Sequence, residues 1–461
     1  MTSQRITAET LGELRAILGD RLTTADAVRE QHGRDESPLP PALPDAVAFP
    51  RSTAEVAAIV KVCAGARLPL IPFGAGTSLE GHVLATSGGF SLDLTEMNEI
   101  VRLSVDDLDV TVQAGTTRES LNRQIAREGL FFPVDPGADA TLGGMAATGA
   151  SGTTTVRYGA MRENVLGLQV VLADGSVVET AKRARKSSAG YDLTRLFVGS
   201  EGTLGVITEV TLRLQGLPET IGGAVCQFPD IEGAVRAVIA ILQTGIPVAR
   251  VEFVDELAIK ALNAHSGLSY PVAPLLLLEF HGSPISVAED IKGVGEITSE
   301  FGAVDYRSAV DADERTKLWT ARHASFYASL SLRPGCKAIT TDVCVPISRL
   351  AECILETRRD INEHSLVATM VGHVGDGNFH VMVLVDPTVP SEMTAAEGFN
   401  HRLVERALAM DGTCTGEHGI GLHKMDFLRM ELPGGVDVMR SIKKALDPHN
   451  IMNPGKVLDV D

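Results

Sequence analysis

The spacing of apolar residues predicts alternating helices and strands over the first 130 residues. Leu11, Leu14 and Leu18 recur at helical spacing, and a Pro-rich connection over 37–44 follows. Ser52-Thr-Ala-Glu55 has the form of a capping box, which predicts that a helix begins there. The further elements expected are strands at 46–49, 68–73, 89–94 and 109–113, and helices to about residue 63 and over 118–128. This mixture of β-α-β and plain β segments predicts an α+β fold.

The character of the chain changes twice after this region. Residues 133–209 are rich in Gly, Ser and Thr, with a strand at 165–172 and little helix. A free loop of this length is uncommon in a compact domain, so we expect the tract to wrap around a cofactor. Strands at 224–228 and 275–280 and a helix at 231–242 then indicate a second domain. The divisions predicted are 1–43 (N-terminal helix and Pro-rich connection), 44–219 (first domain), 220–410 (second domain) and 411–461 (C-terminal segment).

Composition argues against several classes of binding partner. The net charge of −18 and the pI near 5.1 argue against binding to DNA or to an anionic membrane surface. The six cysteines are scattered without a C-x-x-C pair, which is typical of reduced thiols in a cytosolic setting. No apolar leader and no apolar stretch of ~20 residues is visible. We therefore expect a cytoplasmic protein without a transmembrane segment, or one held at a membrane only through an electron acceptor.

Three glycine-rich tracts point to a phosphate-bearing ligand. The first, Pro72 to Gly81, follows a strand, so its backbone N–H groups can converge on a phosphate. It lacks the Rossmann fingerprint because Leu79 occupies the third glycine position. The second and third tracts cover 136–152 and 199–205. Together they can enclose a long planar ligand with a pyrophosphate.

The C-terminal half carries a group of metal-binding residue types. His373-Val-Gly-Asp-Gly-Asn-Phe-His380 places two imidazoles around a turn, and Asn378 and His380 share one face of the strand that follows. Gly416-Glu417-His418-Gly419 adds a carboxylate and a third imidazole. Two His and one carboxylate form a known type of metal site with open positions. Adjacent residues do not easily reach one ion, so Glu417 is the expected ligand and His418 the expected base.

The residues alone leave other functions open. A metal-dependent hydrolase or transferase with a nucleotide substrate has the same ingredients, as does an electron-transfer subunit with a degenerate site. The metal also stays open between Zn, Mn and Fe, because imidazole and carboxylate ligands suit all three.

The three glycine-rich tracts resemble the FAD-binding domain of the vanillyl-alcohol-oxidase-like (PCMH-type) flavoproteins. The resemblance runs from about residue 44 to the C-terminus and implies a two-lobed FAD-binding domain, a cap domain with an antiparallel sheet flanked by helices, and a C-terminal segment that returns to the FAD. Some members attach FAD through a His at the position of Thr77, so non-covalent FAD is expected, with His82 as the nearest histidine. The residues implied for FAD are Pro72, Gly74, Ala75, Gly76, Thr77, Ser78, Pro136, Gly137, Thr141, Gly143, Gly144, Ala147, Thr148, Ser151, Gly152, Glu201, Gly202, Gly205, Ile207 and Asn453.

The histidine motifs resemble the flavoproteins that oxidise D-2-hydroxy acids, namely D-lactate dehydrogenases of the cytochrome-linked type, glycolate oxidase flavin subunits and D-2-hydroxyglutarate dehydrogenases. The segments 319–323, 333–337, 341–348 and 412–418 look closest to the D-lactate dehydrogenases. The resemblance implies His373, His380 and Glu417 as ligands of a divalent metal, and His418 as the base. It also implies Arg322 and Lys337 as contacts of the substrate carboxylate, and we expect Asn378 to bind the substrate as well.

Chemistry agrees with this allocation of roles. A metal lowers the pKa of the substrate hydroxyl, a neutral His takes its proton, and hydride leaves for the flavin. Phe326 lies one helical turn beyond Arg322, and its phenyl ring favours an apolar substrate side chain over a second carboxylate. We expect D-lactate oxidation, with 2-hydroxyglutarate or glycolate as the alternative. A cytochrome, a quinone or an electron-transfer flavoprotein is the expected acceptor, and a homodimer is an option.

Overall fold

The computed structural model describes residues 6–309 and 312–460. Residues 1–5 of the predicted N-terminal segment lie outside the described residues. The chain divides into two compact units, each with its own sheets and core. The first unit contains Met1–Ser151, Gly159–Leu217 and Glu417–Asp461. The second unit contains Gly152–Tyr158 and Pro218–Gly416.

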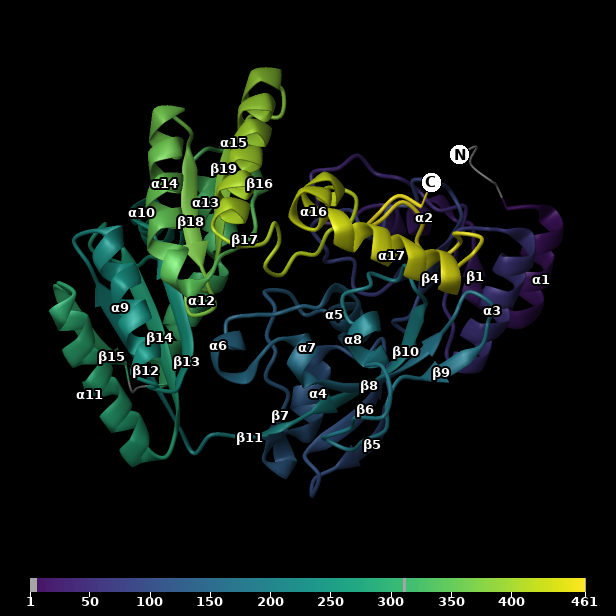
Figure 1. Ribbon diagram of the computed structural model, residues 1–461, viewed down its shortest axis with the longest axis horizontal. Coiled ribbons are helices and arrows are strands. Elements are labelled where there is room, and N and C mark those ends of the chain that lie inside the picture. The colour runs from purple at the N-terminus through teal and green to yellow at the C-terminus, as the bar shows by residue number, and fades with distance from the viewer. Residues whose placement is uncertain (1–5, 310–311, 461) are drawn as a thin grey trace. The chain divides into compact units, whose positions relative to one another are not determined.

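A small mixed sheet, whose β1 and β4 are labelled in Figure 1, opens the first unit, with strand order β1-β2-β4-β3. β2 and β3 run parallel to β4, and β1 runs antiparallel to β2. The strands are β1 Leu22–Thr23, β2 Ala46–Ala48, β3 Leu70–Phe73 and β4 Phe90–Asp93. The helices of this region are α1 Ala8–Leu18, α2 Asp26–His32 and α3 Thr53–Ala66. Leu14, Ile59 and Phe90 are fully buried in its core, and β3 leads directly into the first glycine-rich tract.

An antiparallel sheet forms the rest of the first unit, in the order β5-β6-β10-β8-β9. Its strands are β5 Ile100–Ser104, β6 Asp109–Gln113, β8 Val165–Val171, β9 Val177–Glu179 and β10 Val206–Arg213. A short pair joins β7 Leu130–Phe131 to β11 Gln215–Gly216. The helices are α4 Arg118–Ile125, α5 Leu142–Thr148, α7 Met161–Asn164, α8 Leu193–Phe197, α16 Met425–Glu431 and α17 Pro433–Leu446.

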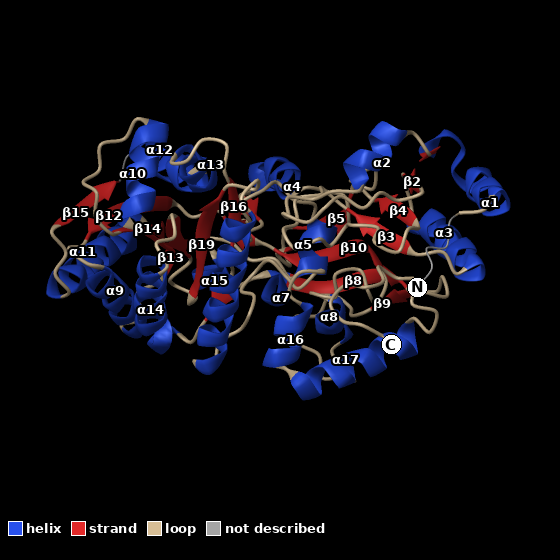
Figure 2. Ribbon diagram, turned by 90° about the horizontal axis from the view of Figure 1, so that it is seen from above, coloured by secondary structure: helices blue, strands red, loops and turns tan. Residues whose placement is uncertain are grey.

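The second unit is built on an antiparallel sheet in the order β15-β12-β14-β13-β18-β19-β16, with β17 paired to β19. Helices cover both of its faces, with α9, α11, α14 and α15 on one side and α10, α12 and α13 on the other (Figure 2). The strands are β12 Thr220–Gln227, β13 Val248–Val254, β14 Leu275–Gly282, β15 Asp305–Ala309, β16 Lys337–Thr340, β17 Val343–Cys344, β18 Ala368–Gly372 and β19 Asn378–Val385. The helices are α6 Thr155–Tyr158, α9 Ile231–Gln243, α10 Glu256–Ser266, α11 Pro284–Glu300, α12 Ala312–His323, α13 Ser325–Ser331, α14 Leu350–Glu363 and α15 Pro390–Ala409.

The α+β prediction, including an antiparallel second-domain sheet flanked by helices, is confirmed. Three local expectations differ. Ser52 caps α3 by accepting the N–H of Glu55, but the Glu55 carboxylate binds the Arg51 N–H and pairs with Arg21, so the reciprocal bond of a capping box is replaced. The 133–209 tract holds four short helices, α5 to α8, where little helix was expected. The helix expected over 118–128 ends in a 3₁₀ turn from Ala126.

Candidate active site

The three glycine-rich tracts converge within the first unit. The backbone N–H of Gly199 donates to Ala146 O at 3.0 Å, and that of Glu201 donates to Ala147 O at 2.8 Å. These bonds join the second tract to the third. A Cβ added at Gly202 would lie 3.0 Å from Pro72 Cγ, which places the third tract against the entrance of the first.

The first and second tracts meet at Gly74 and Thr141. Thr141 caps α5 by accepting the N–H of Gly144, and a Cβ at Gly74 would lie only 2.4 Å from its Oγ1. A larger residue than glycine would therefore push Thr141 away from the cap. Gly76 has φ +68°, which glycine adopts without strain. The loop thus presents backbone with few Cβ atoms, which suits a bound pyrophosphate.

The structure describes the surroundings of two further residues predicted to contact FAD, and that contact stays a prediction. Ile207 is buried in the core of the antiparallel sheet, so its side chain serves packing there. Gly152 belongs to the second unit, with the short segment that forms α6.

Glu201 holds the C-terminal segment by its carboxylate. Its two oxygens accept hydrogen bonds from the N–H groups of Ile420 at 2.7 Å and Gly421 at 2.8 Å, two and three residues after His418. Asn453 donates from Nδ2 to the carbonyl oxygens of Glu201 and His82 at 2.8 and 3.0 Å. Burial favours the neutral imidazole of His82, yet the Glu201 carboxylate, 3.2 Å from Nε2, outweighs it and raises the pKa of His82.

His418 faces a buried carboxylate. Its Nδ1 lies 3.6 Å from Glu80 Oε1, and Glu80 also pairs with His423 at 2.9 Å and Lys424 at 3.0 Å. Burial alone would raise the pKa of Glu80, but the Lys424 ammonium and hydrogen bonds from His418 and His423 hold it well below its usual range. Glu80 is thus an anion that stabilises positive charge on His418. Glu417, the residue before His418, instead accepts a hydrogen bond from Ser151 Oγ at 2.8 Å.

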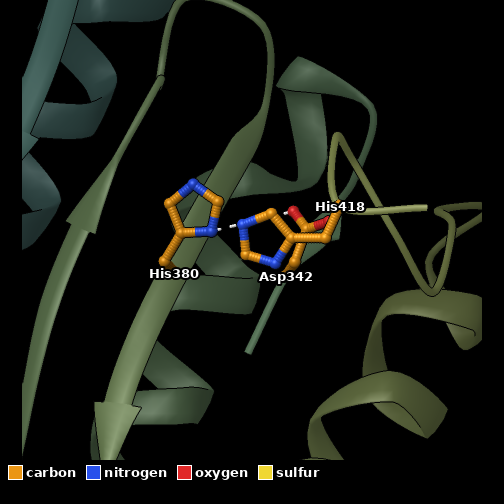
Figure 3. Close-up of side chains that lie close together, drawn as sticks. All are labelled: Asp342, His380 and His418. Atoms are coloured by element: carbon orange, nitrogen blue, oxygen red, sulfur yellow. Dashed lines mark ion pairs between the residues drawn. The ribbon is translucent and has the colours of Figure 1, made fainter. Parts of the chain in front are cut away.

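His373 and His380 face each other in the second unit. His373 lies in the turn that follows β18, His380 lies on β19, and their ring centroids are 5.5 Å apart. His373 Nδ1 lies 2.6 Å from Glu252 Oε1, and His380 Nδ1 lies 3.1 Å from Thr341 O. Figure 3 shows His380 beside Asp342, whose Oδ1 is 3.7 Å from the same Nδ1. Both Nδ1 atoms therefore face acceptors of their own unit.

Arg322 is paired to the same carboxylate as His373. Its NH2 lies 2.6 Å from Glu252 Oε2, and Glu252 is fully buried. Within the described part of the chain, Arg322 Nε is buried without a hydrogen-bond partner. A planar donor with an unused edge suits a carboxylate ligand.

The other residues predicted to bind the substrate differ in burial. Asn378 is buried and donates to Asp342 Oδ1 at 2.7 Å and Val343 O at 2.8 Å. Lys337 is exposed at the start of β16. Phe326 is 39% exposed, with its ring 5.5 Å from that of Tyr327. The expectation that Phe326 continues the helix of Arg322 is wrong, because α12 ends at His323 and α13 begins at Ser325.

The sequence motifs do not predict several residues of these clusters. Glu80 lies among the glycines of the first tract, and Asp342 lies in segment 341–348, and neither position has a local pattern that indicates its partners. Glu252 has a usable signal, because it is a carboxylate in the otherwise apolar end Val251-Glu-Phe-Val254 of a buried strand. A charge in such a strand is costly unless it is paired, so it indicates a partner.

Comparison with known proteins identifies the family. Residues 217–457 match the family described as FAD linked oxidases, C-terminal domain, and residues 44–181 match an FAD binding domain. The chain belongs to the FAD-linked oxidases. It is therefore an FAD-dependent oxidoreductase of the PCMH-type group. The matched FAD binding domain contains the first two glycine-rich tracts.

Relatives of these oxidases match over nearly the whole chain. A protein of Danio rerio named "Probable D-lactate dehydrogenase, mitochondrial" is 53% identical, covering 100% of this chain and 95% of the relative. An Arabidopsis thaliana protein named "D-lactate dehydrogenase [cytochrome], mitochondrial" is 45% identical, covering 99% of this chain and 81% of its own. The structure of p-cresol methylhydroxylase with substrate bound shares the fold, with a TM-score of 0.79 and 18% identity over 100% of this chain and 99% of that one.

Among the described residues, no helix has the length and apolar character needed to cross a membrane.

Proposed function

We propose that this FAD-linked oxidase oxidises D-lactate to pyruvate with the help of a divalent metal and passes the electrons to a cytochrome-type acceptor. The observation that carries the proposal is the facing pair His373 and His380, each held through Nδ1. The proposed substrate, D-lactate, is taken from the names of two relatives, and the cytochrome-type acceptor is taken from the name of one of them. We do not propose 2-hydroxyglutarate or glycolate oxidation, since those relatives favour lactate.

The imidazole pair fits a transition-metal site. An imidazole whose Nδ1 hydrogen faces an acceptor presents the lone pair of Nε2 to a metal, and such second contacts are usual for metal ligands. His373 has Glu252 in this role, and His380 has Thr341 O. Glu417 is the proposed third ligand. Gly416, the residue before it, packs against Asn378 and Asp342, so the chain at 416 is fixed beside the strand of His380.

The substrate carboxylate is proposed to bind Arg322, with Lys337 and Asn378 completing the polar contacts. Support comes from Arg322, whose NH2 is held by Glu252 while its buried Nε makes no hydrogen bond to any described residue. A bound carboxylate would satisfy that donor. A buried donor without a partner costs roughly 1–3 kcal/mol, which substrate binding would recover.

His418 is the proposed base, and it takes the proton from the substrate hydroxyl. When bound, a metal would lower the pKa of that hydroxyl and FAD would take up the hydride from Cα. Glu80 stabilises the imidazolium that His418 becomes, because its carboxylate is ionised and lies 3.6 Å from Nδ1. Gly74, Gly76, Thr77 and Ser78 are proposed to hold the FAD pyrophosphate.

A substrate panel tests the choice of acid. The protein with FAD bound is mixed anaerobically with D-lactate, D-2-hydroxybutyrate, glycolate and D-2-hydroxyglutarate, and loss of flavin absorbance gives each reduction rate. We expect D-lactate to exceed D-2-hydroxyglutarate by about tenfold or more, because burying a second, unpaired carboxylate is costly. Faster reduction by D-2-hydroxyglutarate or glycolate would remove the lactate assignment.

A further inference from the structure

We infer that Glu252 is a positioning residue that serves both halves of the proposed site, the metal ligand His373 and the carboxylate-binding Arg322. This inference rests on the proposed function. Neither the sequence motifs nor the comparisons assign Glu252 a role. Its two carboxylate oxygens are divided between the two residues.

Short contacts to Glu252 fix the positions of both His373 and Arg322. Oε1 lies 2.6 Å from His373 Nδ1, and Oε2 lies 2.6 Å from Arg322 NH2. Glu252 is fully buried on β13, so its charge is far from solvent and interacts strongly with both neighbours. One anion therefore fixes an imidazole and a guanidinium that lie on different elements, the turn after β18 and helix α12.

Each oxygen has a separate consequence. Towards His373, the carboxylate keeps the hydrogen on Nδ1, so that Nε2 is the atom presented to a metal. Towards Arg322, it holds one amino group and leaves the Nε edge for the substrate carboxylate. Loss of the charge should weaken metal binding and substrate binding together.

The same unit contains a matched control. Glu279 on β14 is also buried, and its carboxylate also pairs with a histidine and an arginine, His281 at 2.8 Å and Arg250 at 3.5 Å. Glu279→Gln therefore removes the same charge from the same sheet and the same partner types, without touching His373 or Arg322.

The test compares Glu252→Gln with Glu279→Gln and the unmodified protein. Mn²⁺ and Zn²⁺ affinities are measured by titration of the metal-free proteins, and KM and kcat for D-lactate are measured with an artificial electron acceptor. For Glu252→Gln we expect metal binding weakened by about 10- to 100-fold, and KM raised about tenfold. Excess metal should restore kcat but not KM. Glu279→Gln should stay within twofold of the unmodified protein in all of these quantities.

Several results would overturn the inference. Unchanged metal affinity and KM in Glu252→Gln would do so, and so would a change in only one of them. If Glu252→Gln does not fold, Glu252→Asp keeps the charge and shortens the side chain by one methylene, and it should show the same two defects. Failure of the unmodified protein to bind metal or to be reduced by D-lactate would instead contradict the proposed function.

Discussion

Glu417 and His418 are neighbours in the sequence but have different partners. The Glu417 carboxylate accepts a hydrogen bond from Ser151, whereas the His418 ring faces Glu80. This separation supports the allocation of one as ligand and the other as base. The rule that adjacent residues do not easily reach one ion predicts different roles for the two residues, and the roles themselves stay predictions. The buried Glu80 beside His418 could not be predicted from spacing.

Replacing His418 tests the base. His418→Asn should lower the rate of flavin reduction by D-lactate by about 10²- to 10⁴-fold, the usual contribution of general base catalysis, while FAD stays bound. Anaerobic stopped-flow absorbance measures the rate, and the flavin spectrum reports the bound cofactor.

His423→Asn is the control for His418→Asn, because His423 also pairs with Glu80 but has no proposed catalytic role. Its reduction rate should stay within a few-fold of the unmodified protein. Equal rates in His418→Asn and His423→Asn would contradict the role of His418.

Lys456 gives a pH-dependent contribution to stability. It is buried in the first unit and donates to Leu84 O, and burial lowers the pKa of its ammonium to about 7. In the unfolded chain the pKa is about 10.4, so between pH 7 and 10 the unfolded state binds more protons. The unfolding free energy should therefore rise with pH in this window.

Comparison with Lys456→Met isolates this term. From pH 7 to pH 9 the unfolding free energy of the unmodified protein should rise by about 2 kcal/mol relative to the variant. Urea denaturation at both pH values measures the difference. A difference that does not depend on pH would show that Lys456 is charged in the folded protein.

At the scale of elements, the β18–β19 turn and the glycine tracts assemble the clusters. The turn from His373 to Asn378 is predicted from the sequence, because Gly-Asp-Gly reverses a chain between two apolar strands. Helix α5 is not predicted, because Leu-Gly-Gly-Met-Ala-Ala-Thr has two adjacent glycines, which disfavour a helix, and no amphipathic period. Its stability comes from the Thr141 cap and from packing of Leu142 and Met145 in the sheet core. Such long-range packing leaves no local signal.

Gly74→Ala tests the junction of the glycine tracts. The new Cβ would meet Thr141 Oγ1 at 2.4 Å, so either the α5 cap or the loop must move. Loss of a cap costs about 1 kcal/mol, and we expect FAD affinity to fall roughly tenfold. Gly65→Ala on α3 is the control, since no heavy atom lies within 4 Å of its added Cβ. Equal FAD affinity of the two variants, measured by flavin fluorescence titration, would contradict the junction's role.

At the scale of the whole molecule, the α+β class follows from the sequence, but the division into units follows only in part. Residues 152–158 join the second unit because α6 packs on β13, about 90 residues further along the chain. Residues 411–416, which we placed in the C-terminal segment, pack with the second unit as well. Partners so distant in sequence are chosen by tertiary packing, which neither periodicity nor composition reports.

The central claim is stereospecific, metal-assisted oxidation of D-lactate by the flavin. The most direct measurement is anaerobic reduction of the FAD-bound protein by D-lactate and by L-lactate, before and after removal of metal by a chelator. The account predicts rapid loss of flavin absorbance with D-lactate alone, its loss on chelation, and its return when Mn²⁺ or Zn²⁺ is added back. Reduction by L-lactate at the same rate, or reduction by D-lactate that chelation leaves unchanged, would contradict it.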